Sequence, residues 1–193
     1  MEGNVEIISK SCVWGVDLLM ILVLLGTQNN SFSRLLEEVE RCINSNIIKE
    51  EVIVQAGYTK FKSKHMKIFD LISTKKLEEL QDKANIIITH GGVGSIVSSI
   101  KKGKKVIAIP RLHKYGEHVN DHQKEIVNMF GEKKYIIACN EVSDLENALK
   151  KIETFVPEKY KCETSNIINI IEYKSVYVCL GAIVNDKRKG LFY

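Results

Sequence analysis

Residues 85–96 have the residue types and spacing that most directly indicate chemistry. Asn85–Thr89 is a short apolar run typical of a strand, and it continues into His90-Gly91-Gly92-Val93-Gly94-Ser95 and then a helical pattern. A strand that passes through a glycine turn into a helix presents unpaired backbone N–H groups at the helix N-terminus, where they bind anions. We therefore predict a phosphate or diphosphate site here; the plainer alternative is a tight turn without a ligand.

A dense polar segment follows the next predicted strand. Pro110-Arg111 ends that strand, and Gly116-Glu117-His118-Val119-Asn120-Asp121-His122-Gln123 comes a few residues later. The carboxyl ends of neighbouring parallel strands meet at one edge of a sheet. This segment and the glycine turn together therefore predict a site for a phosphorylated polar ligand.

Alternating strand and helix patterns surround these segments. We expect strands at 20–25, 51–55, 67–72, 85–89, 105–109 and 135–138, and helices at 31–43, 75–83, 95–102, 120–130 and 142–153. Asn30 or Ser31 suits the N-cap of the first helix, and Gly103 suits the end of the third. Such alternation favours the α/β class, with a doubly wound, mostly parallel, Rossmann-like sheet.

The composition is that of a globular domain with appended sequence. The chain has 193 residues, 45% of them hydrophobic, and a net charge of +4 spread over many lysines, which does not indicate nucleic-acid binding. Its five cysteines show no C-x-x-C spacing, so we expect reduced thiols and neither a zinc site nor a disulfide framework. The apolar stretches 16–25 and 176–184 are too short to span a bilayer.

Three parts of the chain are expected from these patterns. Residues 20–153 contain the regular alternation and form the domain, and residues 1–19 form an extension of uncertain status. Residues 154–193 form a C-terminal tail that either contacts a partner or is poorly ordered.

Five segments in order resemble the C-terminal, nucleotide-sugar-binding half of the family 28 glycosyltransferases, the MurG-like enzymes with a GT-B fold. They are Gly26-Thr27-Gln28, Gln55-Ala56-Gly57, Thr89 to Ser95, Pro110-Arg111, and Gly116 to Gln123. The sequence resembles the stand-alone versions of this half more than the C-terminal half of the full-length enzymes. These include the bacterial exopolysaccharide protein PssE and the cytosolic subunit of the dolichol-linked N-acetylglucosaminyltransferase. The resemblance covers residues 20 to about 152.

The resemblance implies inverting transfer of a hexose from a UDP-sugar to a lipid-linked acceptor, in exopolysaccharide or capsule synthesis. It implies no cofactor and no metal, and the sequence contains no Asp-x-Asp motif. In such proteins a membrane-anchored partner supplies the other half of the cleft, including the general base. We therefore expect a donor-binding subunit with little or no activity alone, cytoplasmic and held at the inner face of the membrane through its partner.

The resemblance also implies contacts to the donor diphosphate. His90 would either orient the second turn or touch phosphate, and Arg111 would either counter phosphate charge or make a surface salt bridge. The two turns that face the diphosphate would be formed by Gly26, Thr27, Gly91, Gly92, Gly94 and Ser95.

Further residues match positions near the transferred sugar. Asp121 and Gln123 match an acidic-x-Gln pair that meets the sugar hydroxyls, with helix capping as the alternative. His118 would stabilise the leaving diphosphate or place the acceptor, and Glu117 would accept a hydroxyl; a solvated loop is the alternative for both. These two are the candidate catalytic residues of this chain.

The nucleoside part of the site departs from the family pattern. The family's ribose-binding glutamate falls on Ser98 or Ser99 here, and a serine cannot act as a charged acceptor. Uracil would be read by the loop at 72–74, largely through backbone groups.

Two other functions compete with a catalytic half-enzyme. One is a non-catalytic scaffold or activator subunit of such a transferase. The other, less favoured, is a dinucleotide-binding oxidoreductase: Gly92-x-Gly94 matches only part of that fingerprint, because Val97 stands at the third glycine and no acidic residue ends the next strand.

Overall fold

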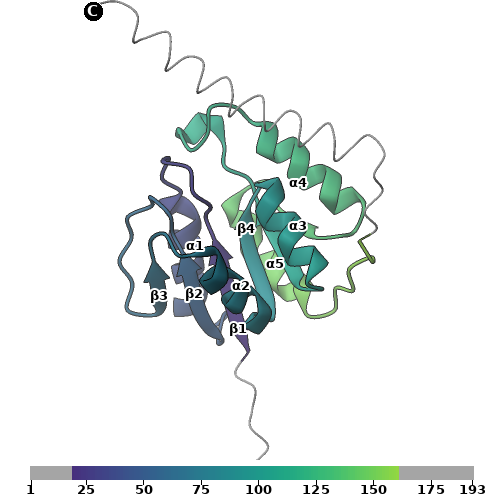
Figure 1. Ribbon diagram of the computed structural model, residues 1–193, viewed down its shortest axis with the longest axis horizontal. Helices are drawn as coiled ribbons and strands as arrows, with labels where there is room; N and C mark the ends of the chain where they lie inside the picture. Colours follow the sequence, from purple (N-terminus) through teal and green to yellow (C-terminus); the bar gives the residue numbers. More distant parts are fainter. Residues whose placement is uncertain (1–18, 161–193) are drawn as a thin grey trace, which may run out of the picture.

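In the computed structural model, which describes residues 19–160, six parallel strands form a sheet in the order β3-β2-β1-β4-β5-β6 (Figure 1). This confirms the expected doubly wound α/β class. The strands are β1 (Met20–Leu24), β2 (Glu51–Gln55), β3 (Met66–Phe69), β4 (Ile86–His90), β5 (Lys105–Ile109) and β6 (Ile137–Ala138).

The strand order reverses between β1 and β4. The chain winds outward from β1 to β3, returns to the other side of β1, and winds outward again from β4 to β6. β1 and β4 pair in parallel with Leu24 opposite Thr89, so the turns that follow both strands leave the same edge of the sheet. In open α/β sheets such a reversal opens a crevice beyond the strand ends.

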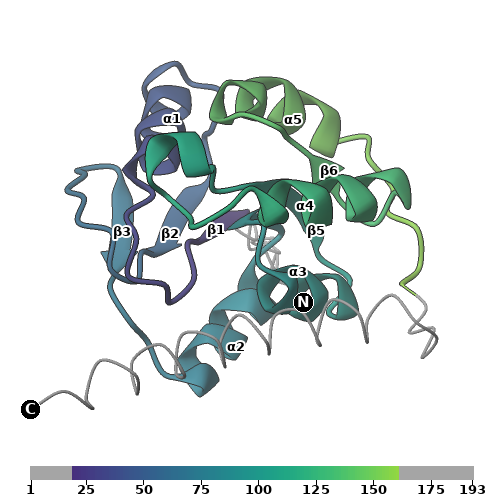
Figure 2. The same cartoon turned by 90° about the horizontal axis from the view of Figure 1, so that it is seen from above.

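Two layers of helices cover the sheet (Figure 2). The helices α1 (Ser33–Asn44) and α5 (Leu145–Ile152) pack on one face. The other face is covered by α2 (Thr74–Lys83), α3 (Val93–Lys101) and α4 (His122–Glu132). Successive residues of β1 alternate between the two cores, which is why strands buried on both faces appear in the sequence as continuous apolar runs.

The expected elements are all present, and their boundaries agree within three residues. The short 3₁₀ helices η1 (His113–Tyr115) and η2 (Val142–Asp144) were not predicted, and η2 forms the first turn of the expected last helix. Gly103 follows α3 with a φ of +69°, which confirms its predicted role as a stop signal.

The predicted cap of α1 is wrong. Phe32, rather than Asn30 or Ser31, occupies the N-cap position, and its side chain is buried. Its backbone N–H donates to Thr59 Oγ1 at 3.0 Å. A hydroxyl from the loop after β2 thus provides a tertiary contact at the start of the helix.

The chain continues to pack on the domain after residue 153. Phe155 contacts the core under α1 and α5, and the ring of Tyr160 meets that of Tyr135 edge to face at 5.3 Å. Glu158 N donates to Lys134 O at 3.0 Å. The rest of the expected tail, from residue 161, and the extension before Leu19 lie outside the described residues.

Candidate donor site at the reversal of strand order

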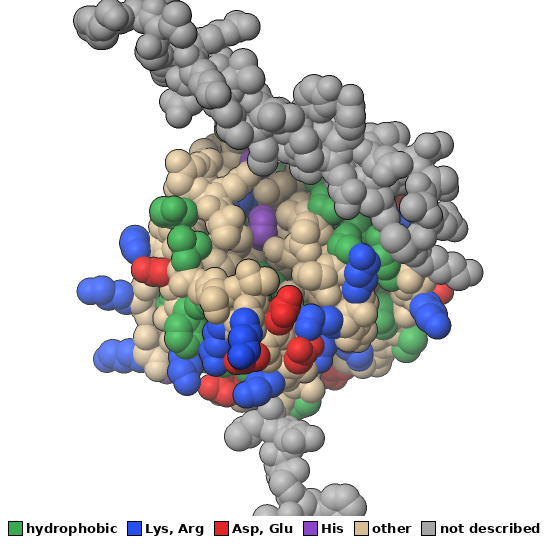
Figure 3. All heavy atoms as spheres, viewed as in Figure 1, with side chains coloured by type: hydrophobic (Ala, Val, Ile, Leu, Met, Phe, Trp, Pro, Cys, Tyr) green, Lys and Arg blue, Asp and Glu red, His purple; other side chains and the backbone are tan. Residues whose placement is uncertain are grey.

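A cavity of about 320 Å³ lies where β1 and β4 end. Figure 3 looks into a hollow on this face, where a histidine side chain is visible; His90 is the histidine in the cavity wall. The wall is formed by residues at or just after the ends of four strands and by residues of α2, α3 and α4: Leu24, Gly26, Thr27, Gln28, Gln55, Leu71, Ile72, Leu77, His90, Gly92, Gly94, Ser95 and Gln123.

The turn after β1 is held by the side chain of Gln55, a residue of the second family segment for which no role was predicted. Gly26 has a φ of +77°, a conformation that favours glycine. The amide of Gln55 clasps it: Gly26 N donates to Gln55 Oε1 at 3.2 Å, and Gln55 Nε2 donates to Gly26 O at 3.0 Å. This N–H is therefore already used by the fold, and Thr27 contributes the exposed hydroxyl at the cavity wall.

His90 lies between the two glycine turns. A β-carbon on Gly26 would lie 2.6 Å from His90 Cε1, and one on Gly92 would overlap His90 Nε2. His90 Nδ1 is 3.2 Å from Leu24 O, and because a carbonyl only accepts, Nδ1 carries the proton. Burial, reinforced by the charge of Arg111, lowers the pKa of His90 to about 4, so the ring is neutral at physiological pH. It orients both turns, and its Nε2 is left as an acceptor.

The N-terminus of α3 opens into this cavity. Gly92 is the N-cap and, within the described chain, has no side-chain cap; its own N–H donates to His90 O at 2.8 Å. The N–H groups of the first helical turn, including those of Gly94 and Ser95, have no acceptor within the helix. Two of these residues line the cavity, so the amides and the positive end of the helix dipole face its interior.

The side-chain amide of Gln123 also lines this cavity. Its Oε1 accepts from Arg111 N at 3.1 Å. Since a backbone N–H can only face the oxygen of the amide, the NH₂ group is directed the other way and can donate to a ligand. A β-carbon on Gly91 would lie 2.7 Å from Gln123 Cβ, so Gly91 serves the close approach of α4 and does not line the cavity.

Arg111 is buried, so its predicted role in a surface salt bridge is wrong. Its side chain is 1% exposed, and its guanidinium donates to Leu25 O at 2.6 Å and to Asn30 O at 2.9 Å. Burial lowers the pKa of Arg111, partly offset by Glu117. The residue holds the β1–α1 loop in place and does not belong to the cavity wall.

Glu117 is also a structural residue and not a hydroxyl acceptor. Its carboxylate is 5% exposed and binds Arg34 through two hydrogen bonds of 2.9 Å, and it accepts from Leu112 N at 3.0 Å. Arg34 also contacts Glu141 at 3.0 Å and lies 4.1 Å from the ring centre of Tyr115. This network fastens the β5–α4 loop to α1.

Asp121 and His118 lie outside the cavity wall. Asp121 Oδ1 accepts from His113 N at 2.8 Å, which stabilises η1, and the acidic member of the expected pair does not line the cavity with Gln123. His118 Nδ1 is 3.0 Å from Asn120 O, and its Nε2 is 3.4 Å from Gln28 Nε2. His118 therefore bridges from the β5–α4 loop to the β1–α1 loop beside the cavity.

The two serines at the family's ribose position belong to the packing of α3. Ser98 Oγ and Ser99 Oγ both donate to Ser95 O, at 3.2 and 2.6 Å. They also accept from the buried Gln81 of α2. Neither lines the cavity, whereas Ile72, in the loop expected to read uracil, does.

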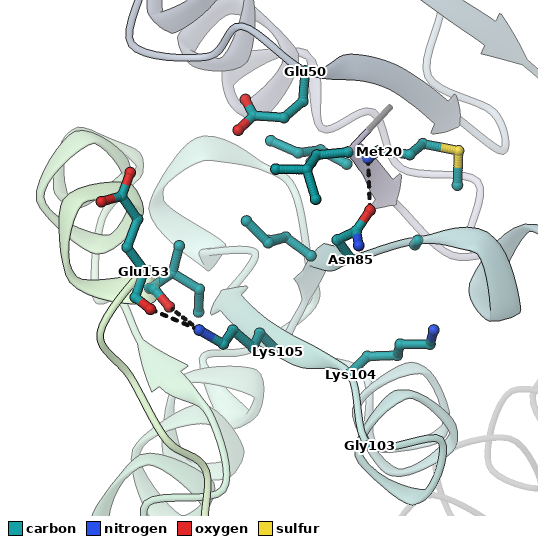
Figure 4. Close-up of a pocket in the computed structure, with 12 residues that line it drawn as sticks. Met20, Glu50, Asn85, Gly103, Lys104, Lys105 and Glu153 are labelled. Carbon is teal, nitrogen blue, oxygen red and sulfur yellow. Dashed lines mark hydrogen bonds between the residues drawn. The ribbon is translucent and has the colours of Figure 1, made fainter. Parts of the chain in front are cut away.

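A second hollow, of about 590 Å³, lies at the opposite edge of the sheet, where the strands begin (Figure 4). Some of its polar groups pair with one another: Lys105 Nζ donates to the carbonyls of Ile152 and Glu153 at 2.8 Å, and Met20 N donates to Asn85 Oδ1 at 2.9 Å.

Some features are absent from residues 19–160. No helix there is both long and apolar enough to cross a membrane. No three His, Cys, Asp or Glu side chains of that range are grouped where they could hold a metal ion.

A doubly wound parallel sheet with a helix N-terminus in a cavity at its reversal point is the architecture of the Rossmann class. Residues 20–172 match the glycosyltransferase family 28 C-terminal domain. The chain belongs to this family, as the five segments predicted.

Individual relatives agree with this assignment. Over 120 residues the chain is 25% identical to the UDP-N-acetylglucosamine transferase subunit ALG13 of Candida glabrata, and the match covers 61% of this chain and 57% of that protein. The chain thus spans little more than half the length of this curated relative.

Solved structures show the same fold. The NMR solution structure of ALG13 aligns with a TM-score of 0.54 and 16% identity, over 79% of this chain and 94% of that one. The glycosyltransferase of kitacinnamycin aligns with a TM-score of 0.51 and 15% identity, over 70% and 35%.

Proposed function

We propose that this chain is the donor-binding subunit of a hexosyltransferase and that the cavity beyond β1 and β4 binds the diphosphate of a UDP-sugar. The observation that carries this proposal is the uncapped N-terminus of α3, which faces the same cavity as the amide of Gln123. Helix amides bind phosphate oxygens, and the adjacent amide NH₂ donates to an oxygen of the phosphate or of the sugar.

The neutral histidine fits this role. A protonated His90 would be a second cation near Arg111, whereas the neutral ring holds both turns without adding charge. Attraction for the anion then comes from backbone amides, which are fixed in place before the ligand arrives.

The shape of the site supports a two-part enzyme. The cavity opens to the surface (Figure 3), and its volume lies at the small end of ligand sites. The Candida glabrata relative is itself named a subunit. We infer that a second, membrane-anchored subunit covers the cavity, supplies the general base and brings the lipid-linked acceptor, at the cytoplasmic face of a membrane. N-acetylglucosamine is the first sugar to test because of that relative's name.

Titration calorimetry of the full chain with UDP, UDP-N-acetylglucosamine and NAD tests the donor site. We expect the two uridine nucleotides to bind and NAD to give no heat. In Gln123→Glu the Oε1 contact to Arg111 N is retained, but a carboxylate replaces the donor NH₂ beside the phosphate site. Its UDP affinity should fall at least ten-fold.

Asn128→Asp is the matched control, because it adds the same charge to α4 at a half-buried residue that does not line the cavity. Equal UDP affinity in Gln123→Glu and wild type would refute the donor site. Transfer activity in the presence of a partner subunit, without any UDP binding to this chain, would instead support the scaffold function.

A further inference from the structure

The connection between β2 and β3 has an unusual form for a parallel pair. Residues 56–65 run from the carboxyl end of β2 back to the start of β3 without a helix, so this segment lies along the edge of the sheet (Figure 1). From Gly57 to Phe69 the sequence contains five basic residues and no acidic one. They are Lys60, Lys62, Lys64, His65 and Lys67.

The middle of this segment alternates between buried or half-buried and exposed residues. Phe61 packs against the core under α1, and Ser63 Oγ donates to Glu40 of α1 at 2.5 Å. The residues between and beside them, Lys60, Lys62 and Lys64, are exposed. Because Thr59, Phe61 and Ser63 are turned inward, the three lysines between and beside them lie on the outer side of the segment, here called the lysine ridge.

Little negative charge neutralises this row. Asp70 pairs with Lys60 at 3.0 Å in an exposed contact, and Glu40, which accepts from Ser63 Oγ, is a carboxylate beneath the segment that, among the described residues, forms no ion pair with the three lysines. Figure 3 shows basic side chains projecting on the side of the molecule where Figure 1 places β3, with few acidic ones among them. The ridge is therefore a surface for an anion that is larger than a single phosphate.

The ridge leads to the mouth of the donor cavity. Its first member, Lys60, lies beside Asp70 at the carboxyl end of β3, and Leu71 of that end lines the cavity. Leu71 and Tyr58, at the ends of neighbouring strands, are each about half exposed, at 53% and 52%. An aromatic and an aliphatic side chain beside several lysines is a composition suited to the interface of a bilayer.

We propose that the lysine ridge binds the surface of an anionic phospholipid bilayer, so that this chain contacts the membrane directly and not only through a partner. Lysines near an anionic surface attract it independently of any specific headgroup. If the proposed function holds, this contact places the donor cavity beside the bilayer that contains the lipid-linked acceptor. The lipid contact itself does not depend on sugar transfer.

Two competing roles for the ridge predict different behaviour. Lysines on a sheet edge also prevent edge-to-edge pairing with another chain. If that is their role, the lysine variants should self-associate, and neither they nor the wild type should bind vesicles. The ridge could instead bind an acidic partner protein. In that case the wild type should not bind to vesicles in the absence of the partner.

The test is flotation of the full chain with vesicles of phosphatidylcholine and of phosphatidylcholine mixed with phosphatidylserine. We expect binding only to the anionic vesicles, weakened by added salt. Lys62→Gln/Lys64→Gln should bind about 25-fold more weakly, since each lysine contributes roughly a factor of five. Lys133→Gln/Lys151→Gln removes the same charge from exposed positions at the end of α4 and on α5 and should bind like the wild type.

Several results would overturn the proposal. These are no binding of the wild type to anionic vesicles, an equal loss in both double variants, or a ridge variant that binds vesicles normally but loses an acidic protein partner. UDP titration of the same variants separates the membrane contact from the donor site, because the ridge lysines do not line the cavity. UDP binding should be unchanged even where vesicle binding is lost.

Discussion

Gly94 offers a substitution in which stability and ligand binding are expected to change in opposite directions. It lies in the first turn of α3 at the cavity wall, and a β-carbon there would meet no atom within 4 Å. Alanine therefore fits without strain, and its higher helix propensity should stabilise the protein by about 0.5–1 kcal/mol. For a chain of this size that raises Tm by about 2–3 °C.

The same methyl group would project at the amides proposed to hold phosphate. Moving the phosphate away from one backbone N–H loses a hydrogen bond to a charged group, about 1.5–3 kcal/mol. That corresponds to a roughly 10- to 100-fold weaker UDP affinity. Gly94→Ala should thus be more stable and yet bind UDP less tightly, as measured by thermal unfolding and titration calorimetry.

Gly103→Ala is the matched control at the other end of α3. A β-carbon on Gly103 also meets open space, but its φ of +69° makes alanine strained, so this variant should lose stability and keep its UDP affinity. Unchanged UDP affinity in Gly94→Ala, together with the expected rise in Tm, would refute the reasoning that phosphate sits on this helix terminus.

Further predictions concern groups that the fold buries. The pKa of His90 is about 4 in the folded protein and 6.5 in the unfolded chain, so the stability due to its neutral form is fully present above pH 6.5 and is lost as pH falls towards 4. Between pH 7.5 and 5 the free energy of unfolding, measured with urea, should therefore fall by about 2 kcal/mol more in the wild type than in His90→Asn. Glu117→Gln should lower the free energy of unfolding by about 2 kcal/mol, because it weakens the charged hydrogen bonds to the partly buried Arg34; an unchanged urea midpoint would contradict the network. Burial raises the pKa of Cys42 to about 11 and of Cys139 to about 12, so neither thiol should react with a disulfide reagent at pH 7.5 before the protein unfolds.

The sequence was most informative where structure is determined locally. The glycine turn after β4 and the stop at Gly103 depend on neighbouring residues, and both are found where they were expected. The roles of Arg111 and Glu117 could not be predicted from their neighbours in the sequence. Their partners Asn30 and Arg34 lie more than eighty residues earlier in the chain, and a loop glutamate has the same appearance in a sequence whether it is exposed or buried.

Those two residues nevertheless help to define the site. Gln55 clasps the first turn, Arg111 holds the β1–α1 loop, and Glu117 fastens the β5–α4 loop to α1. Each of these contacts satisfies polar groups at the strand ends and so removes them from any role in binding. The polar groups that the fold leaves available around the cavity are the amides at the start of α3, the NH₂ group of Gln123, the hydroxyl of Thr27 and Nε2 of His90. Because the helix amides and the NH₂ group are donors, the ligand that they suit best is an anion rich in oxygen, and a diphosphate meets that requirement.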